Sequence, residues 1–169
     1  MPRLSTLFAV SPFDPQNRFF ASAVLPAPLL TAIRLVIATY VFATLIYTLA
    51  YSSIHDPRGV GRHWSYFTNI TNWSAAFYFL FAGGHGVGYC LTGTPPLQRW
   101  PRWLQAAHGL LWTTMLTFPL LVTLVFWIIL APDSSPFKTT FDGWSNVRTH
   151  SPNVLLGLLL IGSRSRRMR

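Results

Sequence analysis

The feature that most constrains this chain is the absence of charged side chains from its long apolar stretches. These stretches are Leu35–Tyr51, Ser65–Leu91, Gln105–Ala131 and Ser151–Ser163. Charged residues make up 10% of the chain, against about 25% in an average soluble domain. Hydrophobic residues make up 51%, so the chain has too few polar groups to cover its apolar surface in water. The composition excludes an ordinary soluble enzyme, and it excludes a disordered chain because disorder requires low hydrophobicity and high charge.

The lengths of these stretches predict an all-α integral membrane protein. A transmembrane helix needs about 20 apolar residues, so we expect three full transmembrane helices and a short fourth one in a helical bundle. The expected domains are a proline-containing polar lead (1–28), a transmembrane helical domain (29–163) and an Arg-rich tail (164–169).

Several local features refine this expected bundle. Arg34 directly precedes the first stretch, and we expect its guanidinium to extend to the lipid headgroups. The segment 52–64 is expected to be a loop. Gly84 and Gly88 form a G-x-x-x-G pattern, which permits close helix packing. Pro119 lies inside the third stretch and is expected to kink that helix.

The charges indicate a membrane partner rather than a nucleic acid. The net charge is +9, but the basic residues lie in short clusters between apolar stretches, as they do in membrane proteins. No basic face or zinc pattern accompanies them, so no nucleic-acid partner is expected. If the fourth helix crosses the membrane, the positive-inside rule favours a cytosolic N-terminus. The histidines and the single Cys90 show no metal-binding spacing, so no metal is expected.

Polar residues that could support catalysis occur at the start of the second stretch and before the fourth. Thr68, Thr71 and Asn72 fall within one helical turn and share a face. Asn146 and His150 are four residues apart and share a face if their segment is helical. The alternating topology places both groups on the same side of the membrane.

A Thr–His pair can hydrolyse an ester, because His has a pKa near neutrality and can take the proton from a hydroxyl nucleophile. Thr68 and His150 lie at matching depths on this side of the bundle, so the geometry permits such a pair. Thr71 is an alternative nucleophile, and His63, His55, His85 and His108 are rival bases. The side chains of Asn146, Asn153 and Asn72 could orient the imidazole or donate to an oxyanion. The same Thr and Asn residues could instead have a purely structural role, because Thr and Asn in membrane helices often form hydrogen bonds within their own helix or to a neighbouring one.

Three motifs in this chain resemble the androgen-induced and androgen-dependent integral membrane hydrolases. The first is Trp64-x-x-Phe67-Thr68. The second is Phe118-Pro119 followed by Val125-Phe-Trp-Ile-Ile129, and the third is Trp144-x-Asn146-x-x-x-His150. The motifs follow the order of the family and cover about residues 60–160.

The resemblance implies a cofactor-free lipid hydrolase of endomembranes such as the endoplasmic reticulum. Its substrates would be fatty acid esters of hydroxy fatty acids, with Thr68 as nucleophile and His150 as its partner. Members of the family continue with further helices, so a truncated member is expected. The alternative is a non-catalytic multi-span membrane protein, either a truncated relative or an interaction protein similar to the rolling-stone proteins. The oligomeric state is left open.

Overall fold

The computed structural model describes residues 25–55 and 57–130, with isolated positions at 14, 19, 22, 140, 143, 144 and 147. All regular structure in these residues is helical. The long helices are α2 (Ala27–His55), α4 (Phe67–Thr92) and α5 (Arg102–Val125). Shorter elements are α3 (Pro57–His63), the 3-10 helix η1 (Pro96–Arg99) and the π-helical turn η2 (Phe126–Leu130). The expected all-α architecture is confirmed for this part of the chain.

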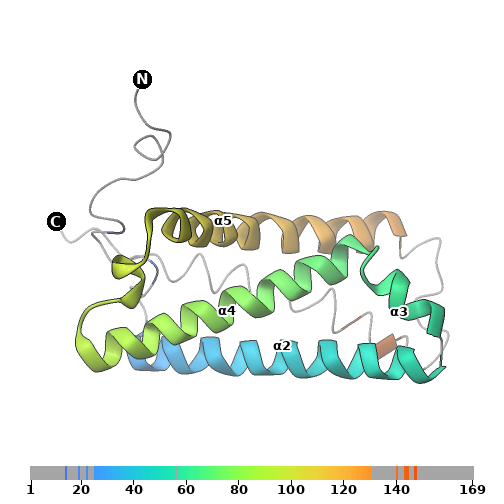
Figure 1. The fold of residues 1–169 in the computed structure, drawn as a ribbon. Helices are drawn as coiled ribbons and strands as arrows, with labels where there is room; N and C mark the ends of the chain where they lie inside the picture. Colours follow the sequence, from blue (N-terminus) through green and yellow to red (C-terminus); the bar gives the residue numbers. More distant parts are fainter. Residues whose placement is uncertain are drawn as a thin grey trace.

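The three long helices form an antiparallel bundle in which α4 is the central helix (Figure 1). Helix α4 packs against α2 along most of its length and against α5 on its other side, whereas α2 and α5 barely contact each other. Because of this order, the end of α2 lies beside α3 and the start of α4. The start of α2 lies at the opposite end of the bundle, beside the end of α4.

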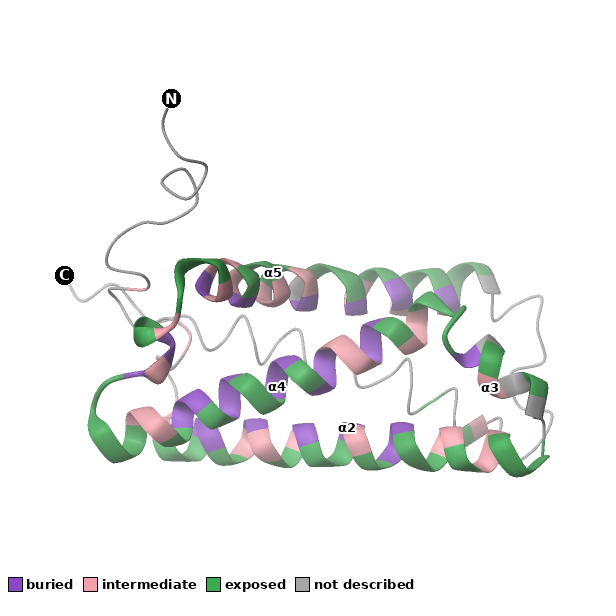
Figure 2. Cartoon of the chain, viewed as in Figure 1, coloured by how far each residue is buried: buried purple, intermediate pink, exposed green. Residues whose placement is uncertain are grey.

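Each long helix buries a stripe of residues; the spacing alternates between three and four on α2 and α4, and it is three, four or seven on α5. This spacing is typical of helices that pack at a small crossing angle, and Figure 2 shows the buried residues along the facing sides. The stripes comprise Thr31, Arg34, Ala38, Val41 and Leu45 on α2, Thr71, Ala75, Tyr78, Ala82 and His85 on α4, and Gln105, His108, Met115, Pro119 and Val122 on α5.

The middle of the bundle is apolar, and the buried polar residues lie toward its two ends. The central cluster contains Ala38, Ala75, Phe79 and Met115 together with the ring of Tyr78. Polar side chains are buried on either side of this cluster. The bundle therefore has two polar regions separated by a packed apolar layer, and these two regions are candidates for function.

Two helical segments, Ala27–His55 and Arg102–Ile129, are long and apolar enough to cross a membrane. Their outer faces expose large hydrophobic side chains, which in a membrane would contact lipid. Examples are Val36 and Ile46 on α2, and Leu110, Leu121 and Leu124 on α5. Two of the three expected full spans thus have the required length and composition. Helix α4 has 26 residues but contains more polar side chains.

Two expectations about the first span and its loop are wrong. Arg34 lies inside α2 rather than before it and is only 3% exposed, with its guanidinium donating to the carbonyl oxygen of Phe19. Helix α2 continues to His55, and residues 57–63 form α3 instead of a loop. Pro57 starts α3, where the missing N–H of a proline costs no intrahelical hydrogen bond.

The glycine contacts also differ from the expected ones. A Cβ at Gly84 would meet nothing within 4 Å, whereas one at Gly83 would lie 2.6 Å from Cδ2 of Leu35. A Cβ at Gly86 would overlap Oγ1 of Thr31. The glycines that allow α2 and α4 to approach closely are therefore Gly83 and Gly86. Helix α5 continues through Pro119 to Val125.

Candidate functional site

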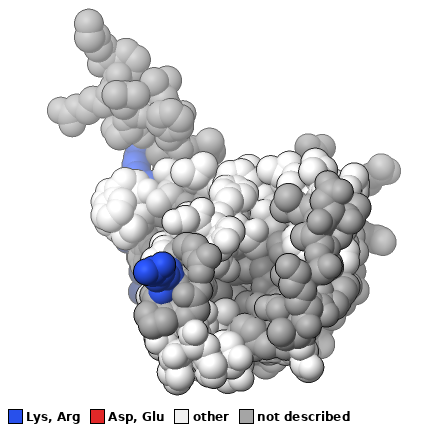
Figure 3. Space-filling view, turned by 90° about the vertical axis from the view of Figure 1, so that its right-hand side faces the viewer, with Lys and Arg blue, Asp and Glu red and all other residues white. Residues whose placement is uncertain are grey.

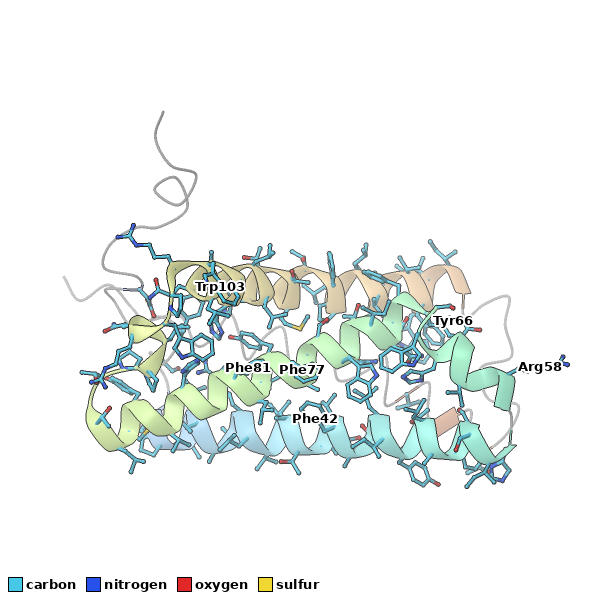
Figure 4. All side chains as sticks on the ribbon, viewed as in Figure 1. Phe42, Arg58, Tyr66, Phe77, Phe81 and Trp103 are labelled. Atoms are coloured by element: carbon cyan, nitrogen blue, oxygen red, sulfur yellow. The ribbon has the colours of Figure 1, made fainter. Side chains whose placement is uncertain are left out.

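The candidate site lies where α3 meets the first turn of α4. A short turn from Trp64 to Tyr66 separates the two helices, and α4 begins at Phe67. Figure 4 shows Tyr66 at this junction, beside the end of α5, and Arg58 pointing away from the bundle. The turn places Thr68 in the first turn of α4, at the end of the buried stripe.

Thr68 differs in its hydrogen bonding from the other threonines of the three long helices. Its side chain is half-buried, and its hydroxyl makes no hydrogen bond to any residue that the structure describes. Each of the other threonines in α2, α4 and α5 makes a side-chain hydrogen bond, in most cases to a carbonyl three or four residues earlier. A hydroxyl that is not bonded to its own backbone can still bond to a general base, and a hydroxyl nucleophile needs such a base.

Thr71 is placed differently, although it lies on the same stripe one turn later. It is buried, and its hydroxyl donates to the carbonyl oxygen of Phe67 at 2.9 Å. Next to it, Asn72 is also buried, and its Nδ2 makes no hydrogen bond within the described residues. The hydrogen bonds thus distinguish Thr68 from Thr71, and they leave an amide donor of Asn72 available one turn away.

A histidine and a tryptophan brace this turn, and no sequence motif indicates that they pair. The indole N–H of Trp73 donates to Nε2 of His63 at 3.1 Å, and Nδ2 of Asn69 donates to the His63 carbonyl at 2.9 Å. The ring of Trp64 stacks on Trp73 with centroids 5.6 Å apart. Because Nε2 accepts this bond, the neutral ring carries its proton on Nδ1. His63 therefore holds the turn in place, and its Nε2 is not available to take a proton from Thr68.

Aromatic contacts bring parts of all three sequence motifs to this end of the bundle. The rings of Phe67 and Phe118 lie 5.2 Å apart between centroids, joining the start of α4 to α5. Trp144 contacts Tyr47, near the end of α2, with centroids 5.6 Å apart. The expected site residues Asn146, His150 and Asn153 lie outside the described residues.

Among the residues that the structure describes, few charged side chains lie at the Thr68 end of the bundle. Figure 3, a view onto this end, shows few basic side chains and no acidic ones among the described residues. Within the same residues, no group of three His, Cys, Asp or Glu side chains could hold a metal ion. The arrangement that the structure describes can supply a neutral hydroxyl and an amide donor in apolar surroundings.

Comparison with protein-family models, with curated proteins and with solved structures gives no match for this chain.

Proposed function

We propose that this protein is an intramembrane ester hydrolase that cleaves fatty-acyl esters of hydroxy fatty acids, with Thr68 as nucleophile and His150 as general base. The observation that carries the proposal is the uncommitted hydroxyl of Thr68 among threonines that otherwise make hydrogen bonds. Thr68 is also the position that the family resemblance selects. The role of His150 is assigned from that resemblance. The contact between Trp144 and Tyr47 supports the assignment, because it places Trp144, which belongs to the same motif as His150, at this end of the bundle.

In the proposed reaction, Oγ1 of Thr68 attacks the ester carbonyl carbon while its proton passes to the imidazole of His150. The tetrahedral intermediate expels the alkoxide of the hydroxy fatty acid, which takes the proton from His150, and an acyl-threonine ester remains. Water then attacks this ester with His150 as base, releasing the fatty acid and restoring Thr68. Nδ2 of Asn72 would donate to the oxyanion, and Asn146 or Asn153 would orient the imidazole.

The proposal includes α4 as a third membrane span. Several of its polar side chains, those of Thr71, Asn72, Tyr78 and His85, are buried within the bundle, where membrane helices keep such groups away from lipid. Its opposite face exposes hydrophobic side chains, including Phe77, Leu80, Phe81 and Leu91. In this arrangement the site lies near one membrane surface, and we propose an endomembrane such as the endoplasmic reticulum with a cytosolic N-terminus.

The test is labelling by a hydrolase-directed fluorophosphonate probe in membranes that contain the full chain. Labelling of the natural protein should be lost in Thr68→Ala and in His150→Ala. The matched control is Thr71→Ala, which removes a hydroxyl that is already bonded to Phe67. Hydrolysis of a fatty-acyl ester should fall at least ~10³-fold in Thr68→Ala, the scale seen when a catalytic nucleophile is removed.

Thr68→Ser adds a second control because it retains a hydroxyl at the same position. It should keep measurable labelling, whereas Thr71→Ala should stay close to the natural protein. Undiminished labelling of Thr68→Ala would refute the proposed nucleophile. No labelling of any form, together with no hydrolysis, would favour a non-catalytic membrane protein.

A further inference from the structure

A second polar region lies at the other end of the apolar layer, where all three long helices contribute a buried polar side chain. Arg34 on α2, Tyr78 on α4 and His108 on α5 are each at most 4% exposed. Arg34 is close enough to both Tyr78 and His108 for an electrostatic interaction. The rings of Tyr78 and His108 have centroids 5.7 Å apart. We call these three residues the Arg34 layer.

Arg34 has no acidic partner in the helices that surround it. Helices α2, α4 and α5 contain no Asp or Glu, and the only other charged side chain in them is that of Arg102 at the start of α5. Within the described residues, its one hydrogen bond is to the carbonyl oxygen of Phe19. A guanidinium has five N–H donors. A buried cation inside a membrane protein is expensive unless it is paired, and the described residues supply no anion to Arg34.

The other two members of the layer supply further donors. The hydroxyl of Tyr78 and Nε2 of His108 are buried, and neither makes a hydrogen bond within the described part of the chain. A phenol donates readily to an anion, and a neutral imidazole does so in the tautomer with its proton on Nε2. The layer thus combines one fixed positive charge with two neutral donors, which matches an acceptor with a single negative charge.

We propose that the Arg34 layer binds the carboxylate of a long-chain fatty acid. A carboxylate has one negative charge and two oxygens that match the planar fork of Arg34. A phosphate monoester would bring nearly two charges to a layer that offers one.

The position of the layer favours a ligand with an apolar tail. Arg34 lies seven residues into α2, which is about 10 Å from the start of the helix. An inorganic anion would have to leave water to reach this depth, whereas a fatty acid enters the bilayer with its own hydrocarbon chain. Phe19 covers the layer, with its ring 5.1 Å from that of His108 and 5.9 Å from that of Trp112. These rings give the first carbons of the acyl chain an apolar contact.

This inference does not depend on the proposed reaction at Thr68. Tyr78 and Thr68 are ten residues apart on α4, which corresponds to about 15 Å along the helix. Binding at the layer is therefore measured without any hydrolysis, and the Thr68→Ala variant should bind the fatty acid as the natural protein does.

The test uses the full chain in nanodiscs of neutral phosphatidylcholine and a palmitic acid that carries a photoreactive diazirine. Oleate, methyl oleate and oleoyl lysophosphatidic acid serve as competitors for crosslinking. Oleate should compete strongly and methyl oleate at least about 10-fold more weakly, because only the free acid accepts charge-assisted hydrogen bonds. Arg34→Gln should weaken oleate binding about 10- to 100-fold and Tyr78→Phe about 10-fold. The control is Arg58→Gln, whose side chain is exposed on α3 and should not matter.

Three results would overturn the inference. Equal competition by methyl oleate would show that the carboxylate is not recognised. Undiminished binding in Arg34→Gln would show that the layer is not the site. Stronger competition by lysophosphatidic acid, lost in Arg34→Gln, would assign the layer to a phosphate headgroup instead. If Arg34→Gln does not fold, oleate binding is measured in Tyr78→Phe and His108→Gln, which preserve side-chain size. Undiminished binding in both variants would then overturn the inference.

Discussion

The two polar regions on the buried stripe of α4 differ in how far the protein itself satisfies their hydrogen bonds. Beside Thr68, Thr71 bonds to Phe67 and Trp73 bonds to His63, while Nδ2 of Asn72 makes no hydrogen bond within the described residues. In the Arg34 layer, a full positive charge and two neutral donors have one described acceptor, the carbonyl of Phe19. The first region is thus a braced turn that leaves one hydroxyl and one amide donor unbonded within the described residues. The second is a cluster of donors around a guanidinium, for which we propose an anionic ligand.

This difference predicts opposite effects on stability when polar groups are replaced by apolar ones. In the braced turn, such a change removes a bond and should destabilise the protein. In the Arg34 layer, it removes a group whose burial is costly, so it should stabilise the ligand-free protein. Three substitutions test this contrast.

The largest effect is expected for Arg34→Met, which replaces a buried guanidinium by an apolar side chain of similar length. The free energy of unfolding of the ligand-free protein should rise by about 2 kcal/mol, because the cost of burying an unpaired charge is removed. Unfolding in mixed micelles of increasing denaturing detergent measures this change. Arg58→Met is the control, and an exposed position should change stability by less than about 0.5 kcal/mol. A clear loss of stability in Arg34→Met would show that Arg34 is already well paired.

Trp73→Phe should act in the opposite direction. It keeps an aromatic ring between Trp64 and Phe42 but removes the N–H that donates to His63. We expect a loss of about 1–2 kcal/mol in the free energy of unfolding, since a buried ring nitrogen loses its donor. The same unfolding titration measures it, and an unchanged midpoint would mean that this hydrogen bond does not brace the turn.

Tyr78→Phe should give the smallest effect on stability. The hydroxyl is buried and unbonded within the described residues, and the ring itself is packed in the core. Its removal should raise the free energy of unfolding by about 0.5–1 kcal/mol while weakening fatty-acid binding. Stability measured with and without oleate separates the two effects. A destabilised ligand-free Tyr78→Phe would contradict the view that this hydroxyl serves a ligand.

The sequence predicted the long helices well where apolar runs define them. The second stretch was expected at 65–91, and α4 covers Phe67–Thr92. The first apolar stretch is expected to begin at Leu35, because a charged residue such as Arg34 usually marks the end of a membrane span. Arg34 is instead buried by contacts from distant parts of the chain, including Phe19, and such contacts leave no periodic signal in the sequence. The loop expected at 52–64 contains Pro57, and a proline is favoured at the first position of a helix such as α3.

The candidate site was only partly predictable for a related reason. Side-chain spacing placed Thr68, Thr71 and Asn72 on one face of α4, but it could not say which hydroxyl is committed to its own backbone. That distinction depends on the helix start at Phe67, which gives Thr71 a carbonyl partner four residues earlier. The pairing of His63 with Trp73 joins two elements across a turn, so neither a helical nor a strand period reveals it.

The most direct test of the central claim is to locate the covalent adduct that a fluorophosphonate probe forms with the natural protein. The labelled chain is digested and its peptides are sequenced by tandem mass spectrometry, which separates Thr68 from Thr71 by fragment masses. If Thr68 is the nucleophile and His150 its base, a single adduct forms on Oγ1 of Thr68 and is absent when His150 is replaced by alanine. An adduct on Thr71, or on another hydroxyl of the chain, would contradict it.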